Sequence, residues 1–183
     1  MLWHEATFFK DEEEFLVYNK AFTKITYGMY IISSSLNGKL NGMIATTACQ
    51  VTSDPPAISV TINKENLTHE FIQNSGIFSV SILSKETSFP FIGRFGFRSG
   101  REIDKFEGVG HKMGKSGVPI VLDNATGYIE AKVKSTLDVG THTIFIADVV
   151  DAEVLSEAEP MTYAYYHEIK GGKSPKAAPT YMK

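Results

Sequence analysis

Residues 41–56, NGMIATTACQVTSDPP, constrain the fold more than any other segment of the chain. An Asn-Gly pair at 37–38 precedes them, and this pair is the strongest short-range signal for a β-hairpin. Pro55–Pro56 closes the segment and ends ladder pairing, because proline has no N–H to donate. The pattern therefore predicts a strand over 41–54 that runs antiparallel to an apolar strand at 29–35.

The rest of the chain is also dominated by strands. Apolar or alternating runs predict strands at 57–63, 77–83, 127–137 and 141–155, and periodicity predicts helices at 11–28, 65–76 and 84–96. Gly-rich and charged residues at 98–123 predict a long excursion. Neighbouring strands with inserted helices favour a mainly β, antiparallel barrel with peripheral helices over an alternating βαβ sheet. One domain at 1–170 is expected, with a linker-like tail at 171–183.

Composition excludes several functional classes. The 183 residues carry a net charge of −3 and no clustered basic surface, so no nucleic-acid partner is expected. No apolar run approaches a membrane span, and the acidic N-terminus lacks the order of a signal peptide. The single Cys49 excludes an intrachain disulfide and a cysteine-based metal site, and the histidines show no metal-ligand spacing. A cytoplasmic protein without a metal is the expectation.

Small hydrogen-bonding side chains fill the 46–52 strand where an ordinary core strand would carry Val and Ile. A bulge at a barrel rim would free backbone N–H and C=O groups for a flat heterocycle, and small side chains would keep its approach open. The alternative is a Thr-rich edge strand. Alternation predicts two faces, one with Thr46, Ala48 and Gln50 and the other with Thr47, Cys49 and Val51.

Two later segments are also candidates for a site. The run 93–106, GRFGFRSGREIDKF, combines open backbone, cations and aromatic rings, which suits an anionic aromatic ligand; the alternative is a solvated loop with buried Phe anchors. His142, between two threonines at the entry to an apolar strand, is either a group that handles protons or orients substrate, or a hydrogen-bonded rim histidine. The run 108–116, GVGHKMGKS, lacks the first glycine of a phosphate-binding P-loop and is interpreted as a surface turn.

These residues together resemble a known family. The segment 41–83, with its small-residue strand, proline pair, strand ending in Asn-Lys, short helix and further strand, resembles the core of the flavin reductase-like, FMN-binding split-barrel proteins. The runs FIGRFGFRSGREIDKF (91–106) and GTHTIFIADVVDAEVL (140–155) are similar to later family segments in the same order. The similarity covers about residues 17–170, and within the family it is greatest to the flavin domain of high-molecular-weight rubredoxins and to flavoredoxin.

The resemblance implies a Greek-key split barrel that forms a homodimer and binds FMN near the dimer interface. By position, it implies that the 46–52 strand lines the isoalloxazine and ribityl chain, and that His142 lies by the ring where nicotinamide stacks. The family often has Asp before this histidine, and here Thr141 takes that place. The implied cofactor-binding residues are Thr46, Thr47, Ala48, Cys49, Gln50, Val51, Thr52, Asn63, Lys64, Ser99, Gly100, Lys105 and Thr143.

The function implied by the resemblance is an FMN-dependent oxidoreductase. It would take a hydride from NADH or NADPH and pass electrons to an acceptor such as free flavin, ferric iron or rubredoxin. The alternative is an FMN-containing electron-transfer protein that a protein partner reduces without nucleotide turnover. His142, the one residue expected at the catalytic centre, would orient cofactor or nicotinamide.

Overall fold

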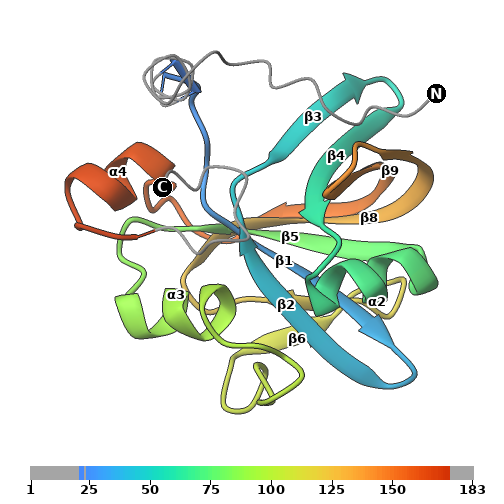
Figure 1. The fold of residues 1–183 in the computed structure, drawn as a ribbon, viewed down its shortest axis with the longest axis horizontal. Coiled ribbons are helices and arrows are strands. Elements are labelled where there is room, and N and C mark those ends of the chain that lie inside the picture. The colour runs from blue at the N-terminus through green and yellow to red at the C-terminus, as the bar shows by residue number, and fades with distance from the viewer. Residues whose placement is uncertain (1–20, 23, 174–183) are drawn as a thin grey trace, which may run out of the picture.

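The computed structural model describes residues 21, 22 and 24–173, and most of the helix predicted at 11–28 lies outside this range. The described residues include nine strands and the helices α2, α3 and α4, arranged as Figure 1 shows. They are β1 (Tyr30–Leu36), β2 (Lys39–Ala45), β3 (Ala48–Ser53), β4 (Pro56–Asn63), α2 (Leu67–Ser75), β5 (Ile77–Leu83), α3 (Phe89–Gly96), β6 (His111–Met113), β7 (Pro119–Val121), β8 (Ala125–Asp138), β9 (His142–Val154) and α4 (Tyr163–Glu168).

Seven of the strands form one antiparallel sheet in the order β2-β1-β5-β8-β9-β4-β3. Its two outermost strands, β2 and β3, follow each other directly in the chain. The sheet therefore curls so that its edges approach, which makes an antiparallel split barrel and confirms the predicted fold class. Figure 1 shows the β3–β4 hairpin extending at the upper right, whereas α3 and α4 lie on the left.

The β1–β2 hairpin forms as predicted. Asn37 and Gly38 adopt φ values of 51° and 75°, the left-handed conformation that a two-residue hairpin turn requires. The prediction of one continuous strand over 41–54 was wrong. The chain leaves β1 after Ala45, crosses at Thr46–Thr47, and pairs with β4 as a separate strand.

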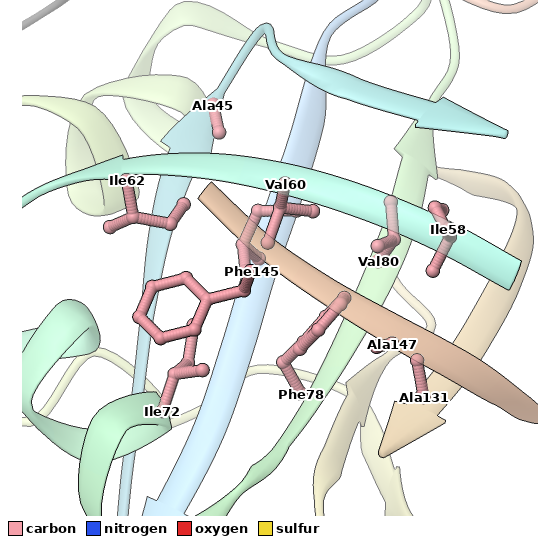
Figure 2. Close-up of a cluster of buried hydrophobic side chains, with 11 residues drawn as sticks. Ala45, Ile58, Val60, Ile62, Ile72, Phe78, Val80, Ala131, Phe145 and Ala147 are labelled. Atoms are coloured by element: carbon pink, nitrogen blue, oxygen red, sulfur yellow. The ribbon is translucent and has the colours of Figure 1, made fainter. Parts of the chain in front are cut away.

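A cluster of buried side chains fills the barrel (Figure 2). Phe145 of β9 and Phe78 of β5 are fully buried there, and Ile72 of α2 closes the cluster from one side. Gly76 ends α2 in the left-handed conformation, as the sequence predicts. A second cluster, around Met29, Phe95 and Tyr166, packs α3 and α4 against the other face of the sheet.

Two features were not predicted. The excursion at 98–123 contains the β6–β7 hairpin, whose strands are only three residues each and carry no readable periodicity. Helix α4 is capped by Thr162, whose hydroxyl accepts from the N–H of Tyr165. Among the described residues, no helix is long and apolar enough to cross a membrane.

Candidate functional site

A cleft opens where β2 ends, between the sheet on one side and α3 and α4 on the other. It encloses about 790 Å³, part of it open to solvent. Its walls are mostly apolar, and three cations face it. The lining residues are Met29, Met43, Ile44, Ala45, Thr46, Thr47, Thr61, Asn63, Asn66, Ile92, Phe95, Gly96, Phe97, Arg98, Lys105, His142, Tyr163, Tyr166 and Lys173.

The crossing from β2 to β3 forms one wall of the cleft. Thr47 Oγ1 donates to the carbonyl oxygen of Thr61 at 2.9 Å, which fixes the crossing to β4. Thr46 is buried and its Oγ1 has no hydrogen-bond partner. A buried hydroxyl without a partner costs about 1–3 kcal/mol, so a polar group of a ligand at this atom would be stabilising.

His142, the first residue of β9, lies opposite Asn63 at the end of β4. Its Nδ1 lies 2.8 Å from Thr141 Oγ1, the hydroxyl of the residue before it in the chain. Its Nε2 is buried without a partner. Burial lowers the pKa of His142, so the imidazole is neutral at neutral pH and Nε2 can serve as donor or acceptor.

Lys105 is a buried cation beside the same cleft. Its Nζ donates to the carbonyl oxygens of Gly42 at 2.9 Å and Phe95 at 3.1 Å, which leaves a third N–H. Only 5% of the residue is exposed, and burial lowers its pKa to about 8. None of the ion pairs found among the described residues involves Lys105. An anionic ligand would supply the missing countercharge.

The C-terminal part of the described chain completes the cleft. Tyr163 and Tyr166 stack with ring centroids 6.3 Å apart. Tyr166 donates its hydroxyl to the carbonyl oxygen of Lys173 at 3.0 Å, and Gly172 lies so close that a Cβ there would meet the Tyr166 ring at 2.2 Å. This contact holds Lys173 at the cleft.

Five of the predicted site residues line the cleft: Thr46, Thr47, Asn63, Lys105 and His142. The others do not. Ala48, Cys49, Gln50, Val51 and Thr52 extend away along β3, where all but Ala48 are exposed. The predicted bulge is present, between Gln50 and Thr52, but it lies outside the cleft of this chain.

The remaining four predicted residues make contacts within the protein. Lys64 pairs with Asp138, and Thr143 Oγ1 lies 2.8 Å from His69 Nε2. Ser99 accepts from the N–H of Arg101, and Gly100 packs so closely on Asn41 that a Cβ there would clash. Gly100 thus serves chain packing in this structure.

Sequence reasoning missed the residues that α4 and the segments around it contribute. Tyr163, Tyr166 and Lys173 are far from the 46–52 strand in sequence, and only the fold brings them to it. The sequence carried a signal for the helix alone, namely the capping residue Thr162 before the run YAYYHEI. Asn66 also lines the cleft, close to the predicted Asn63, and so does Arg98, which lies inside the candidate run 93–106.

The chemistry of the cleft lining fits a flavin. Mostly apolar walls with few polar groups suit a flat ring. Thr46 Oγ1 and His142 Nε2 offer hydrogen bonds to ring edges, and Arg98, Lys105 and Lys173 offer charge for a phosphate. In the described ranges, no three His, Cys, Asp or Glu side chains are placed to hold a metal ion.

Comparisons with known proteins agree with this geometry. The family described as "Flavin reductase like domain" matches residues 22–171. A high molecular weight rubredoxin of Moorella thermoacetica is 52% identical over 162 residues, which cover 88% of this chain and 71% of the relative. A ferric-chelate reductase (NAD(P)H) of Archaeoglobus fulgidus is 53% identical over 164 residues, covering 90% and 97%. The crystal structure of flavoredoxin from Methanosarcina acetivorans superposes with a TM-score of 0.66 at 24% identity, covering 74% of each chain, and so shows the same fold.

Proposed function

Because the chain belongs to the flavin reductase-like domain family, we propose that its cleft binds FMN, and that NADH or NADPH reduces this flavin for transfer of electrons to an acceptor. The chain is an NAD(P)H-dependent oxidoreductase of the flavin reductase class, as its likeness to the ferric-chelate reductase indicates. The observation that carries FMN binding is the pair of buried, unpartnered polar atoms, Thr46 Oγ1 and His142 Nε2, on one cleft.

When bound, FMN supplies the redox chemistry, since it accepts a hydride and can release electrons singly. The protein binds and orients. Thr46 and His142 would hold the ring edge, and the apolar wall that includes Met29 and Ile92 would keep water away. Because the imidazole is neutral, His142 orients cofactor or nicotinamide by hydrogen bonding and carries no charge to the ring.

Two acceptors have support from the relatives. The ferric-chelate reductase favours a ferric chelate, and the high molecular weight rubredoxin favours a rubredoxin-type partner. The second likeness also supports an alternative function, an FMN-containing electron carrier that a protein partner reduces without nucleotide turnover. We favour nucleotide-dependent reduction with a ferric chelate as acceptor, because the match covers 97% of the length of the ferric-chelate reductase. We propose that the protein acts in the cytoplasm.

Spectroscopy of the purified protein tests the proposal. We expect a yellow protein with one FMN per chain, whose flavin absorption is bleached in stopped flow by NADH or NADPH. Bleaching only by a reduced partner protein would favour the electron-carrier alternative. A protein that neither carries nor binds FMN would contradict the proposal.

Thr46→Val is expected to weaken FMN binding and stabilise the FMN-free protein. Removing a buried hydroxyl without a partner should raise the free energy of unfolding by about 1 kcal/mol and lower FMN affinity roughly tenfold. Thr87→Val is the matched control, because the fully buried Thr87 hydroxyl donates to the carbonyl oxygen of Ser84 at 2.7 Å. This control should lose stability and keep FMN affinity; an unchanged FMN affinity in Thr46→Val would argue against hydroxyl contact with the cofactor.

A homodimer is expected in solution. Strand β3 is an edge strand, and residues 49–53 are exposed although they alternate between its two faces. An unpaired edge with an exposed Val51 (49%) is a surface that a second copy can cover, next to the cleft. Light scattering should give twice the 20.2 kDa chain mass, and Val51→Asp should shift the protein toward monomers. A wild-type monomer at micromolar concentration would contradict this expectation.

A further inference from the structure

The turn between β8 and β9, residues 138–142, presents His142 to the cleft. Two hydrogen bonds within the turn fix its shape. The Gly140 N–H donates to the Asp138 side chain at Oδ1 (2.9 Å), and the Val139 N–H donates to the carbonyl oxygen of His142 at 3.0 Å. Gly140 adopts the left-handed conformation, with φ +88°. Lys64 N–H donates to the carbonyl oxygen of Thr141 at 3.0 Å, which ties the turn to the end of β4.

The Lys64 side chain reaches the same turn from the other direction. Its Nζ lies 2.7 Å from both carboxylate oxygens of Asp138. Lys64 and the Gly140 N–H, both donors to Asp138, lower the pKa of this carboxyl group, so it is charged at neutral pH. One residue thus holds the turn at two points, through its backbone at Thr141 and through its side chain at Asp138.

We infer that Lys64 and Asp138 form a clamp that positions the His142 imidazole at the cleft, and that Lys64 is a positioning residue and not a ligand of the FMN phosphate. The inference rests on the proposed function for the identity of the ligand that His142 faces. It departs from the role that family resemblance implies for Lys64, because the ammonium is already engaged and the residue does not line the cleft.

The clamp acts locally and adds little to overall stability. Its side chains are 37% and 70% exposed, and ion pairs this exposed add little to stability because water and salt screen them. Breaking it should therefore leave the melting temperature nearly unchanged. The effect should appear at the turn and at the imidazole, whose Nδ1 meets Thr141 inside the same turn.

The first test uses the FMN-free protein and records the imidazole nitrogen signals of His142 by NMR, assigned with His142→Gln. Lys64→Met and Asp138→Asn should each shift or broaden these signals, and Lys64→Arg should restore them. Lys134→Met is the matched control, since it breaks the Lys134–Asp148 pair, which joins β8 to β9 at similar exposure. Unmoved His142 signals in both clamp variants would overturn the inference.

The second test distinguishes the clamp from phosphate binding by the direction in which Asp138→Asn changes the behaviour of the protein toward FMN. If Lys64 positions His142, Lys64→Met and Asp138→Asn act alike, and both lower flavin reduction by NADH by up to about a hundredfold. If Lys64 instead binds the phosphate, Asp138→Asn frees the Lys64 ammonium and raises the affinity for FMN. Lys64→Met then lowers the affinity for FMN but not for riboflavin, which has no phosphate. This pair of results would overturn the inference. Failure of the wild type to bind FMN would contradict the proposed function and leave the NMR test valid.

Discussion

Lys105→Met is expected to lower FMN affinity at pH 7 by roughly one to two orders of magnitude, because hydrogen bonds to charged groups contribute about 1.5–3 kcal/mol. The ammonium is buried at the cleft with two carbonyl partners and no carboxylate partner among the described residues. An anionic group of the ligand would therefore supply its countercharge. Fluorescence titration with FMN measures the effect, and Lys39→Met, an exposed lysine at the start of β2, is the control.

The same lysine predicts a pH dependence with a definite sign. Its pKa falls from 10.5 in the unfolded chain to about 8 in the folded protein, so between these values the unfolded state binds more protons. The free energy of unfolding of the FMN-free protein should therefore rise between pH 8 and 10.5. FMN affinity should fall over the same range, because the lysine loses its charge.

Urea unfolding of FMN-free protein at pH 7 and pH 9.5 tests this dependence. The wild type should gain stability over that interval relative to Lys105→Met, which lacks the titrating group. An equal pH response in the two proteins would show that Lys105 keeps an ordinary pKa. If Lys105→Met leaves FMN affinity unchanged at every pH, Lys105 does not contribute to FMN binding.

Glu130→Ala is expected to cause the largest loss of stability, about 3 kcal/mol in the free energy of unfolding, because it leaves three partly buried donors without their acceptor. The fully buried Glu130 carboxylate accepts from the backbone N–H groups of Lys115 and Ser116 and from the Ser116 hydroxyl. These donors form the turn between β6 and β7. Gly114 is required there, because a Cβ would lie 2.4 Å from Glu130 Oε2.

Chemical denaturation measures this loss, and two variants define its cause. Glu130→Gln keeps an acceptor and should lose less, whereas Glu153→Gln removes the partner of Lys112 in an exposed ion pair and should change stability little. FMN affinity should survive in Glu130→Ala, since no residue of 107–121 lines the cleft. A loss under 1 kcal/mol would mean that water replaces the carboxylate.

The interpretation of GVGHKMGKS as a surface turn and not a P-loop is confirmed in part, because the run also contains strand β6. The run forms β6 and the start of its turn, and the Lys115 and Ser116 N–H groups bind the protein's own Glu130 where a P-loop would bind phosphate. The missing glycine at Val109 was sufficient evidence against a P-loop. That Glu130 accepts these hydrogen bonds was not predictable from the sequence. It lies 14 residues after Ser116, at a position of β8 that fits the ordinary alternation of a strand.

The sequence by itself determined the local elements. Turn chemistry at Asn37–Gly38, the left-handed stop at Gly76 and the alternation of 127–137 depend on residues next to one another, and each appears where predicted. Family resemblance also indicated residues on both sides of the cleft, namely Thr46, Lys105 and His142. Local signals sufficed in these cases because backbone sterics and side-chain period act over a few residues.

Only the tertiary structure decided how these elements meet. It broke the 41–54 strand at Thr46–Thr47, because the chain there exchanges β1 for β4 as its pairing partner, and no local signal records a change of partner. It paired Lys64 with Asp138, which lies 74 residues away in the sequence. It also brought Tyr166 and Lys173 to the cleft that Met29 lines. Burial and hydrogen bonding between distant segments depend on the whole packed chain, and they left Thr46 Oγ1 and His142 Nε2 without partners at one site.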